Sequence, residues 1–169
     1  TSFVRHVCEV FSWSTAPWTM IFGPASTMPE WLGKIPRPTR ILWWCKTFAQ
    51  IRRGVTWQHA VTPILVYTTD DAVFRWPHGI ITDWIVAASA MAHVRLTNSV
   101  LGTTHPGVTG IPISTELILP TTKVGDLVVD PFAGTGSILV AAKRLQRQVF
   151  GIEIVEKYAN AANKWLEHE

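Results

Sequence analysis

The segment Val128-Val129-Asp130-Pro131-Phe132-Ala133-Gly134-Thr135-Gly136-Ser137 decides the fold of this 169-residue chain. An apolar, β-branched run ends in an acid, two glycines follow, and residues 138–145 repeat apolar side chains at helical spacing. This order predicts a strand, a tight loop and a helix. Glycines let the loop bend and let a ligand approach the backbone, while the helix N-terminus offers N–H groups to an anion. We therefore predict a binding corner for a nucleotide-like ligand.

A second predicted strand, residues 148–154, supports this interpretation. It places Glu153 near its C-terminal end, 17 residues after Gly136. In doubly wound folds an acid at that place accepts hydrogen bonds from a ribose diol. Asp130 and Glu153 are therefore expected at neighbouring strand ends, beside one crevice.

Two classes of cofactor compete for this corner. The dinucleotide fingerprint needs a third glycine, or another small residue, three positions after the second, because the helix must pack closely there. The residue at that position is Leu139. A nicotinamide oxidoreductase is therefore the disfavoured alternative.

The word from Asp130 to Ser137, followed by Gly151-Ile152-Glu153 and Tyr158, resembles the S-adenosylmethionine motif of the amino-directed (N6-adenine/N4-cytosine) DNA methyltransferases. The resemblance implies an α/β fold of the Rossmann-like S-adenosylmethionine-dependent methyltransferase type. Its sheet is expected to be mixed and mostly parallel, with helices on both faces. It also implies S-adenosylmethionine as cofactor, double-stranded DNA with a flipped target base as partner, and transfer of a methyl group to N6 of adenine or N4 of cytosine.

The resemblance also assigns cofactor contacts. Glu153 would hold the ribose hydroxyls and Ile154 would flank the adenine ring. His105, in His105-Pro106, would lie beside the methionine end, although Thr109-Gly110 stands where the family has Lys-Pro, and a simple turn is the alternative. The glycine loop would surround the methionine moiety through Asp130, Phe132, Gly134 and Gly136, together with Pro131, Ala133, Thr135 and Ser137.

The family's catalytic word has the form Asp/Asn/Ser-Pro-Pro-aromatic. Its acceptor groups bind the amine hydrogens and its ring stacks on the flipped base. The nearest string here, Thr15-Ala16-Pro17-Trp18, lacks the first proline, so no catalytic residue is assigned. In the beta-type motif order the word would come just before Thr1, and we expect an incomplete or diverged enzyme that is inactive alone. The alternative is a catalytically silent S-adenosylmethionine-fold protein that binds nucleic acid or a partner supplying the word.

We expect a single methyltransferase domain over residues 1–169. Within it, residues 1–68 form a partial catalytic half, 69–104 a short target-recognition segment and 105–169 the cofactor-binding half. Helices are predicted from the first residues and over 26–32, 113–119 and 156–167, and further strands over 16–24, 40–46 and 64–68. The apolar run Trp84 to Ala92 is too short to span a bilayer and is predicted to be a buried element.

Composition sets looser bounds. A net charge of +3 and a pI near 9.1 are compatible with nucleic acid but do not demand it. Cys8 and Cys45 have no CxxC partner and no histidine at metal spacing, so we predict no metal site and a reduced, cytoplasmic protein. Two sets of residues stay open: arginines that contact phosphate or are merely solvated (Arg52, Arg53, Arg75, Arg95), and tryptophans that are core or contact bases (Trp43, Trp44, Trp57).

Overall fold

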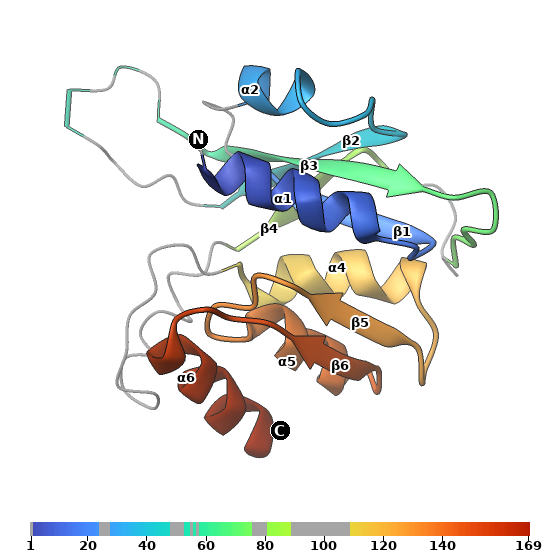
Figure 1. Ribbon diagram of the computed structural model, residues 1–169, viewed down its shortest axis with the longest axis vertical. Helices are drawn as coiled ribbons and strands as arrows, with labels where there is room; N and C mark the ends of the chain where they lie inside the picture. The colour runs from blue at the N-terminus through green and yellow to red at the C-terminus, as the bar shows by residue number, and fades with distance from the viewer. Residues whose placement is uncertain are drawn as a thin grey trace. The chain divides into compact units, whose positions relative to one another are not determined.

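The computed structural model describes residues 2–23, 28–47, 53, 54, 56, 58–75, 81–88 and 109–169. The chain divides into two compact units. Unit 1 comprises Thr1–Val73 and Gly79–Val86, and unit 2 comprises Phe74–His78 and Ala87–Glu169. Each unit has its own sheet (Figure 1). The division at residues 68 and 104 inside a single methyltransferase domain stays a proposal.

Unit 1 is built on a four-stranded sheet with the order β1-β3-β2-β4. The central strand β3 (Val61–Thr68) pairs antiparallel with β1 (Trp18–Phe22) and with β2 (Arg40–Lys46). The edge strand β4 (Trp84–Ala87) adjoins β2. Residues 63–66 of β3 are all buried, as expected for an apolar run in the middle of a sheet.

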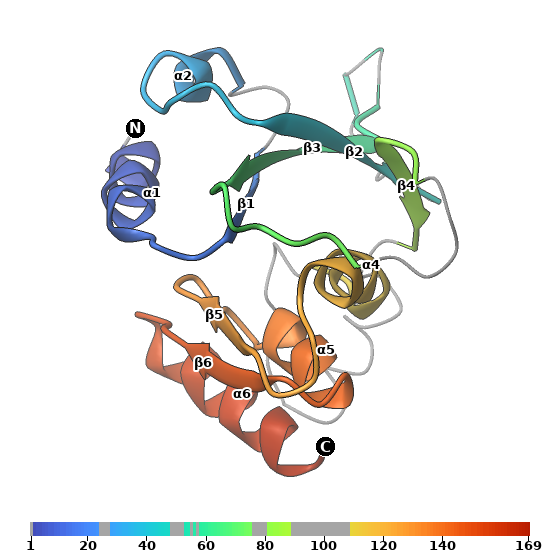
Figure 2. The same ribbon diagram turned by 90° about the vertical axis from the view of Figure 1, so that its right-hand side faces the viewer.

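In the described part of unit 1, helices α1 (Ser2–Trp13) and α2 (Met28–Leu32) accompany this sheet. Helix α1 places Val4 and Val7 on one face, where they pack with Ile21 of β1 and Leu65 of β3. Figures 1 and 2 show α1 lying beside β1. The helical repeat of apolar residues at the start of the chain therefore buries α1 against the sheet.

The described part of unit 2 contains a two-stranded parallel sheet and three helices. Its elements are α4 (Ile111–Thr121), β5 (Leu127–Asp130), α5 (Ser137–Arg144), β6 (Gln148–Gly151) and α6 (Glu156–Glu167). Strands β5 and β6 pair in register, with Asp130 opposite Gly151. The core is formed by Val140, Ala141 and Ala142 of α5 against Ile111 and Ile118 of α4, with Trp165 and Leu166 of α6 packed beside them.

One face of this small sheet is apolar and uncovered. Leu127, Val129 and Phe150 are each slightly more than half exposed, whereas Val128 and Val149 pack against the helices. Side chains alternate along a strand, so the exposed three share a face. Parallel sheets are usually covered on both faces. The described part of unit 2 therefore leaves apolar surface exposed, in line with the high apolar content of the sequence.

Most predicted elements are present, and the α/β class is confirmed. Strand 40–46 and helix 156–167 have the predicted bounds. Strands β1 and β2 are both antiparallel to β3, whereas β5 and β6 are parallel, so the described strands include both kinds of pairing. Strand 148–154 was predicted too long, because β5 ends at Asp130 and the regular pairing of β6 ends with Gly151. Beyond it, Ile152 still donates to the carbonyl of Asp130 and accepts the N–H of Ala133. The prediction of a buried element from residue 84 was wrong for Trp84 and Val86, which are exposed on the edge strand β4.

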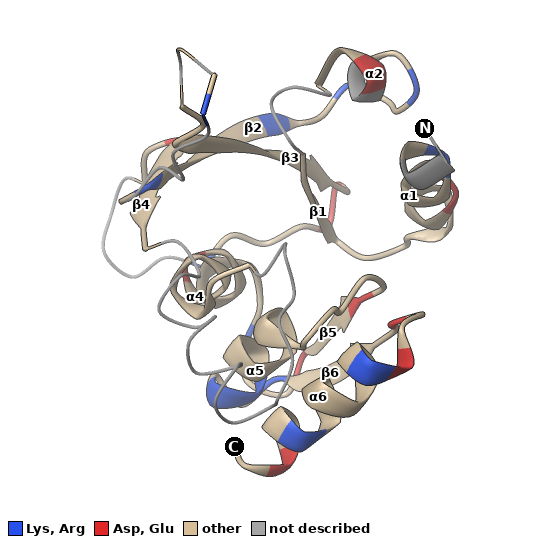
Figure 3. Ribbon diagram, turned by 90° about the vertical axis from the view of Figure 1, so that its left-hand side faces the viewer, with Lys and Arg blue, Asp and Glu red and all other residues tan. Residues whose placement is uncertain are grey.

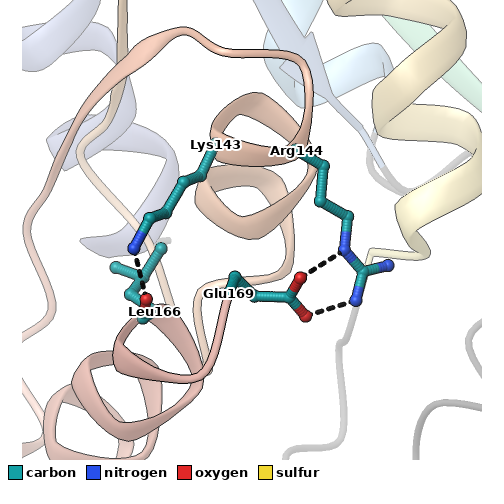
Figure 4. A network of polar contacts seen from close by, with 4 residues as sticks. All are labelled: Lys143, Arg144, Leu166 and Glu169. Carbon is teal, nitrogen blue, oxygen red and sulfur yellow. Dashed lines mark hydrogen bonds and ion pairs between the residues drawn. The ribbon is translucent and has the colours of Figure 1, made fainter.

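Helix α5 is fastened at its C-terminal end. Figure 4 shows Lys143 donating to the carbonyl of Leu166 at 2.5 Å and the guanidinium of Arg144 paired with the carboxylate of Glu169, with Nε to Oε2 at 2.7 Å. The paired geometry of guanidinium and carboxylate fixes orientation as well as charge. These contacts tie α5 to the end of α6 and the residues that follow it.

No helix in the described part of the chain has the length and apolar content needed to cross a membrane.

A buried arginine, Arg147, joins the ends of two helices. Its Nε donates to Thr122 Oγ1 at 2.9 Å, and its terminal nitrogens donate to the carbonyl of Thr122, at 2.8 Å, and to the carbonyl of Leu145. Thr122 and Leu145 cap the C-termini of α4 and α5. Carbonyl groups at helix C-termini lack helical partners and favour a cation. Arg147 therefore closes both helix ends.

We expect Arg147→Met to destabilise the protein by about 2 kcal/mol, because hydrogen bonds to a charged group are lost and their acceptors stay partly buried. Urea unfolding at neutral pH measures the change. Lys164→Met, at an exposed position on α6, is the control and should change stability little. An equal effect of both substitutions would contradict the capping role.

Candidate functional site

The loop between β5 and α5 is compact and folded on itself. Asp130, the last residue of β5, accepts the N–H of Phe132 on Oδ1 at 3.0 Å. The N–H of Gly136 donates to the carbonyl of Ala133 at 2.8 Å, and α5 begins at Ser137. The predicted order of strand, tight loop and helix is thus present over residues 127–144.

Both glycines of the loop have left-handed backbone conformations, with φ of 54° at Gly134 and 84° at Gly136. Residues with a Cβ rarely adopt such angles. A Cβ at Gly136 would also lie 2.9 Å from the Cβ of Ala162 on α6. Gly136 is therefore required both by its backbone angle and by the close approach of α6.

The contact between α5 and β6 depends on a third glycine, but one on the strand. Leu139 is 3% exposed and packs against Gly151, where an added Cβ would overlap the Leu139 side chain and lie 3.1 Å from the Cβ of Ala133. A large residue at position 139 is thus compatible with close packing. Leu139 alone is therefore a weaker argument against a dinucleotide than the sequence indicated. Sequence reasoning missed this role of Gly151, although a glycine inside a strand is a known sign of close approach.

Glu153 reaches back from the end of β6 to the glycine loop. Its Oε2 accepts the N–H of Gly134 at 2.8 Å, and its Oε1 accepts the N–H of Val155 at 2.8 Å. Glu153 lies two residues beyond β6 rather than within it. The structure therefore brings Glu153 and the loop after Asp130 together at one corner.

The corner is acidic. Asp130 is 8% exposed, and its burial raises the pKa of its carboxyl. The N–H of Phe132 opposes this shift of the pKa, whereas the nearby Glu153 carboxylate adds to it. Two carboxyl groups held close together favour a ligand that brings positive charge or hydrogen-bond donors.

The other predicted loop residues divide into two groups. Ala133, Thr135 and Ser137 are buried under the loop and support it. Phe132 is 43% exposed and Ile154 is 96% exposed, so apolar side chains flank the acids at the surface. Pro131 is half-buried between them.

Other candidates are spread over the two units. Trp44 is buried, and its ring packs edge-on against that of Phe22 with ring centroids 6.3 Å apart, which favours the core interpretation. Trp43 is 40% exposed. Arg53 and Arg75 are exposed. Figure 3 shows lysines and arginines scattered over several elements rather than gathered on one. Four candidates lie outside the described residues: Arg52, Trp57, Arg95 and His105. Among the described residues, no three His, Cys, Asp or Glu side chains gather as a metal site.

A family model described as DNA methylase, for N6 and N4 methyltransferases, matches residues 41–164. The chain belongs to this DNA methylase family. The match includes the glycine loop, Glu153 and about half of unit 1. The resemblance to the amino-directed methyltransferases is therefore confirmed.

Individual family members match shorter stretches. The Type II methyltransferase M2.DpnII of Streptococcus pneumoniae is 46% identical over 54 residues, which are 32% of this chain and 20% of the relative. The Type II methyltransferase M.HindIII of Haemophilus influenzae is 35% identical over 86 residues, 48% of this chain and 28% of the relative. The chain thus matches only 20% to 28% of the length of these curated relatives.

Solved structures share the fold. The M1.HpyAVI–SAM complex superimposes with a TM-score of 0.77 at 18% identity, covering 98% of this chain and 82% of that one. The cytosine-N4-specific PvuII DNA methyltransferase gives a TM-score of 0.58 at 17% identity, covering 76% of this chain and 57% of that one. The methyltransferase-like α/β fold predicted for this family member is confirmed.

Gly136→Ala tests the approach of α6 to the loop. Gly125→Ala is a matched control, since Gly125 has nearly the same φ, 85°, but no atom within 4 Å of an added Cβ. We expect the control to cost about 1 kcal/mol through backbone strain. Gly136→Ala should cost about 2 kcal/mol more, because Ala162 must move. Equal costs in thermal or urea unfolding would contradict the close contact.

Asp130→Asn should stabilise the protein at neutral pH by an amount on the order of 1 kcal/mol, because it removes a buried charge that the folded protein disfavours. The pKa of Asp130 is raised by burial, so the folded protein binds more protons than the unfolded chain and loses stability as pH rises through that range. Asparagine keeps an oxygen for the N–H of Phe132.

The measurement is urea unfolding of both proteins between pH 4 and pH 8. The gain should shrink toward the acid end, where Asp130 becomes protonated. Glu116→Gln, at an exposed position on α4, is the control and should show no such trend. If Asp130→Asn is less stable across the whole pH range, the buried carboxylate does not destabilise the folded protein.

Proposed function

We propose that this chain is the cofactor-binding part of an S-adenosylmethionine-dependent DNA methyltransferase that acts on an exocyclic amine, N6 of adenine or N4 of cytosine. The observation that carries the proposal is the corner where Glu153 meets the Gly134 loop, within a chain of the DNA methylase family. M1.HpyAVI, which shares the fold, has been solved as a complex with S-adenosylmethionine.

The residues of the corner fit this cofactor. S-adenosylmethionine has an ammonium and a carboxylate at one end and a ribose diol beside its adenine. Asp130 would accept from the ammonium, directly or through water, and backbone N–H groups of the loop would meet the carboxylate. Glu153 would accept from the diol, while Phe132 and Ile154 offer exposed apolar surface to the adenine ring. The bound cofactor supplies a methyl group on a positively charged sulfur.

Transfer to DNA requires more than this corner. The lone pair of an exocyclic amine is delocalised into the base. The family's Asp/Asn/Ser-Pro-Pro-aromatic word accepts hydrogen bonds from the amine, and its aromatic ring stacks on the flipped base. Residues 1–169 contain no such word. We therefore propose that these residues bind cofactor but methylate DNA only together with polypeptide that supplies the word. Residues 69–104 are proposed to recognise the target and His105 to lie beside the methionine end.

The same missing word favours a second candidate function. A catalytically silent S-adenosylmethionine-fold subunit would bind cofactor, nucleic acid or a partner without ever transferring a methyl group.

Location in the reducing cytoplasm stays a prediction under both candidates, supported by the free thiols of Cys8 and Cys45.

Calorimetric titration tests cofactor choice. We expect saturable binding of S-adenosylmethionine and of its demethylated product, whose ammonium the two acids attract. We expect no binding of NAD, because NAD has no ammonium and its anionic pyrophosphate would lie beside two carboxyl groups. Glu116→Gln should bind like the unaltered protein. Binding of NAD without S-adenosylmethionine would overturn the methyltransferase proposal.

Transfer of a labelled methyl group to unmethylated DNA separates the two candidates. We expect none from residues 1–169 alone, and transfer once an N-terminal segment ending in an Asp-Pro-Pro-Tyr type word is joined to them. Transfer by residues 1–169 alone would contradict the need for the word. Cofactor binding without transfer in either form would favour the silent subunit.

A further inference from the structure

Glu153 does more in the ligand-free protein than offer a carboxylate to solvent. Each of its two oxygens accepts one backbone N–H at 2.8 Å, Oε2 from Gly134 and Oε1 from Val155. Gly134 lies in the loop after β5, and Val155 is the residue from which α6 starts. One side chain therefore links the glycine loop to the beginning of α6.

Glu153 supplies the acceptor for the N–H of Gly134. Gly134 is buried, and a buried N–H without an acceptor is costly. The bond also holds the Glu153 carboxylate near the buried Asp130, and this carboxylate disfavours the charged form of Asp130. A hydrogen bond from N–H to an ionised oxygen is strong enough to offset such repulsion.

The bond to Val155 has a parallel effect on α6. Valine at the N-cap position has no side-chain oxygen, and no side-chain hydrogen bond caps this helix. The carboxylate of Glu153 binds the N–H of this N-cap residue and adds negative charge near the helix N-terminus, where it is favoured. Helix α6 also approaches the loop at Gly136, through Ala162. The position of α6 therefore affects the loop at Gly136 directly and at Gly134 through Glu153.

We propose that Glu153 is a positioning residue that holds the glycine loop in its binding geometry before any ligand arrives. Cofactor affinity should then depend on Glu153 even for a ligand that has no ribose hydroxyls. This second statement rests on the proposed function, whereas the link itself does not.

The substitution Glu153→Gln tests whether both carboxylate oxygens are needed to hold the two backbone N–H groups. Glutamine has the same length but a single acceptor oxygen, and its amide nitrogen would face one of the two N–H donors. One of the two links must therefore fail. Glu153→Asp keeps the charge but is one methylene shorter, so it should not reach both donors. Glu156→Gln is the matched control, since Glu156 is an exposed acid in the first turn of α6.

Amide hydrogen exchange of the ligand-free protein tests the link directly. In Glu153→Gln or Glu153→Asp, exchange at Gly134, at Val155 or at both should become about ten-fold faster, the change expected for one lost hydrogen bond of this kind. Exchange in the middle of α5 should stay as it is, and Glu156→Gln should match the unaltered protein. Unchanged exchange at both amides in both variants would overturn the inference, whatever the protein binds.

Calorimetric titration with two ligands then tests the consequence for binding. The ligands are S-adenosylmethionine and its 2′,3′-dideoxy analogue, which has no ribose hydroxyls. A positioning role predicts that Glu153→Gln weakens both by about ten-fold. Weakening confined to S-adenosylmethionine would show that Glu153 acts only through the ribose and would overturn the claim. If the unaltered protein binds neither ligand, the proposed function fails, while the exchange experiment still decides the link.

Discussion

The hydrogen bond between the N–H of Gly134 and the carboxylate of Glu153, at 2.8 Å, is the interaction on which the proposed cofactor corner depends. Strands β5 and β6 have four residues each, and two short strands are marginally stable by themselves. The ends of these strands must nevertheless hold a loop with two left-handed glycines in one shape. The Glu153 carboxylate fixes that loop from the neighbouring strand end, and the N–H of Val155 fixes the carboxylate.

Close packing supplies the second constraint. Gly136 allows Ala162 of α6 to approach, and Gly151 makes room for Leu139 of α5. These contacts pack helix α6 against the glycine loop and helix α5 against the end of β6. The binding corner is therefore a product of the whole of unit 2 rather than of its glycine motif alone. A ligand with an ammonium and a diol requires a stable loop beside two carboxyl groups, such as those of Asp130 and Glu153.

The sequence predicts this unit well because its signals are local. Residues 127–144 form a strand, a loop and a helix, and α6 has its predicted bounds because its apolar residues repeat at helical spacing. The end of β6 could not be predicted, since it depends on where β5 ends, at Asp130. The packing role of Gly151 depends on Leu139, 12 residues earlier, and becomes visible only once both are placed. In unit 1 an apolar run predicts a strand but does not state its partner, so the antiparallel pairing of β3 with β1 and β2 emerged only from the structure.

The most direct measurement is the mapping of backbone amide NMR shifts while S-adenosylmethionine is added to the ¹⁵N-labelled protein. If the corner binds the cofactor, the largest shifts will fall on residues 130–137 and 153–155, with smaller ones along the first turn of α6. Shifts that concentrate in unit 1 or on the C-terminal end of α5, with the amides of Gly134 and Val155 unmoved, would contradict the assignment of this corner as the cofactor site.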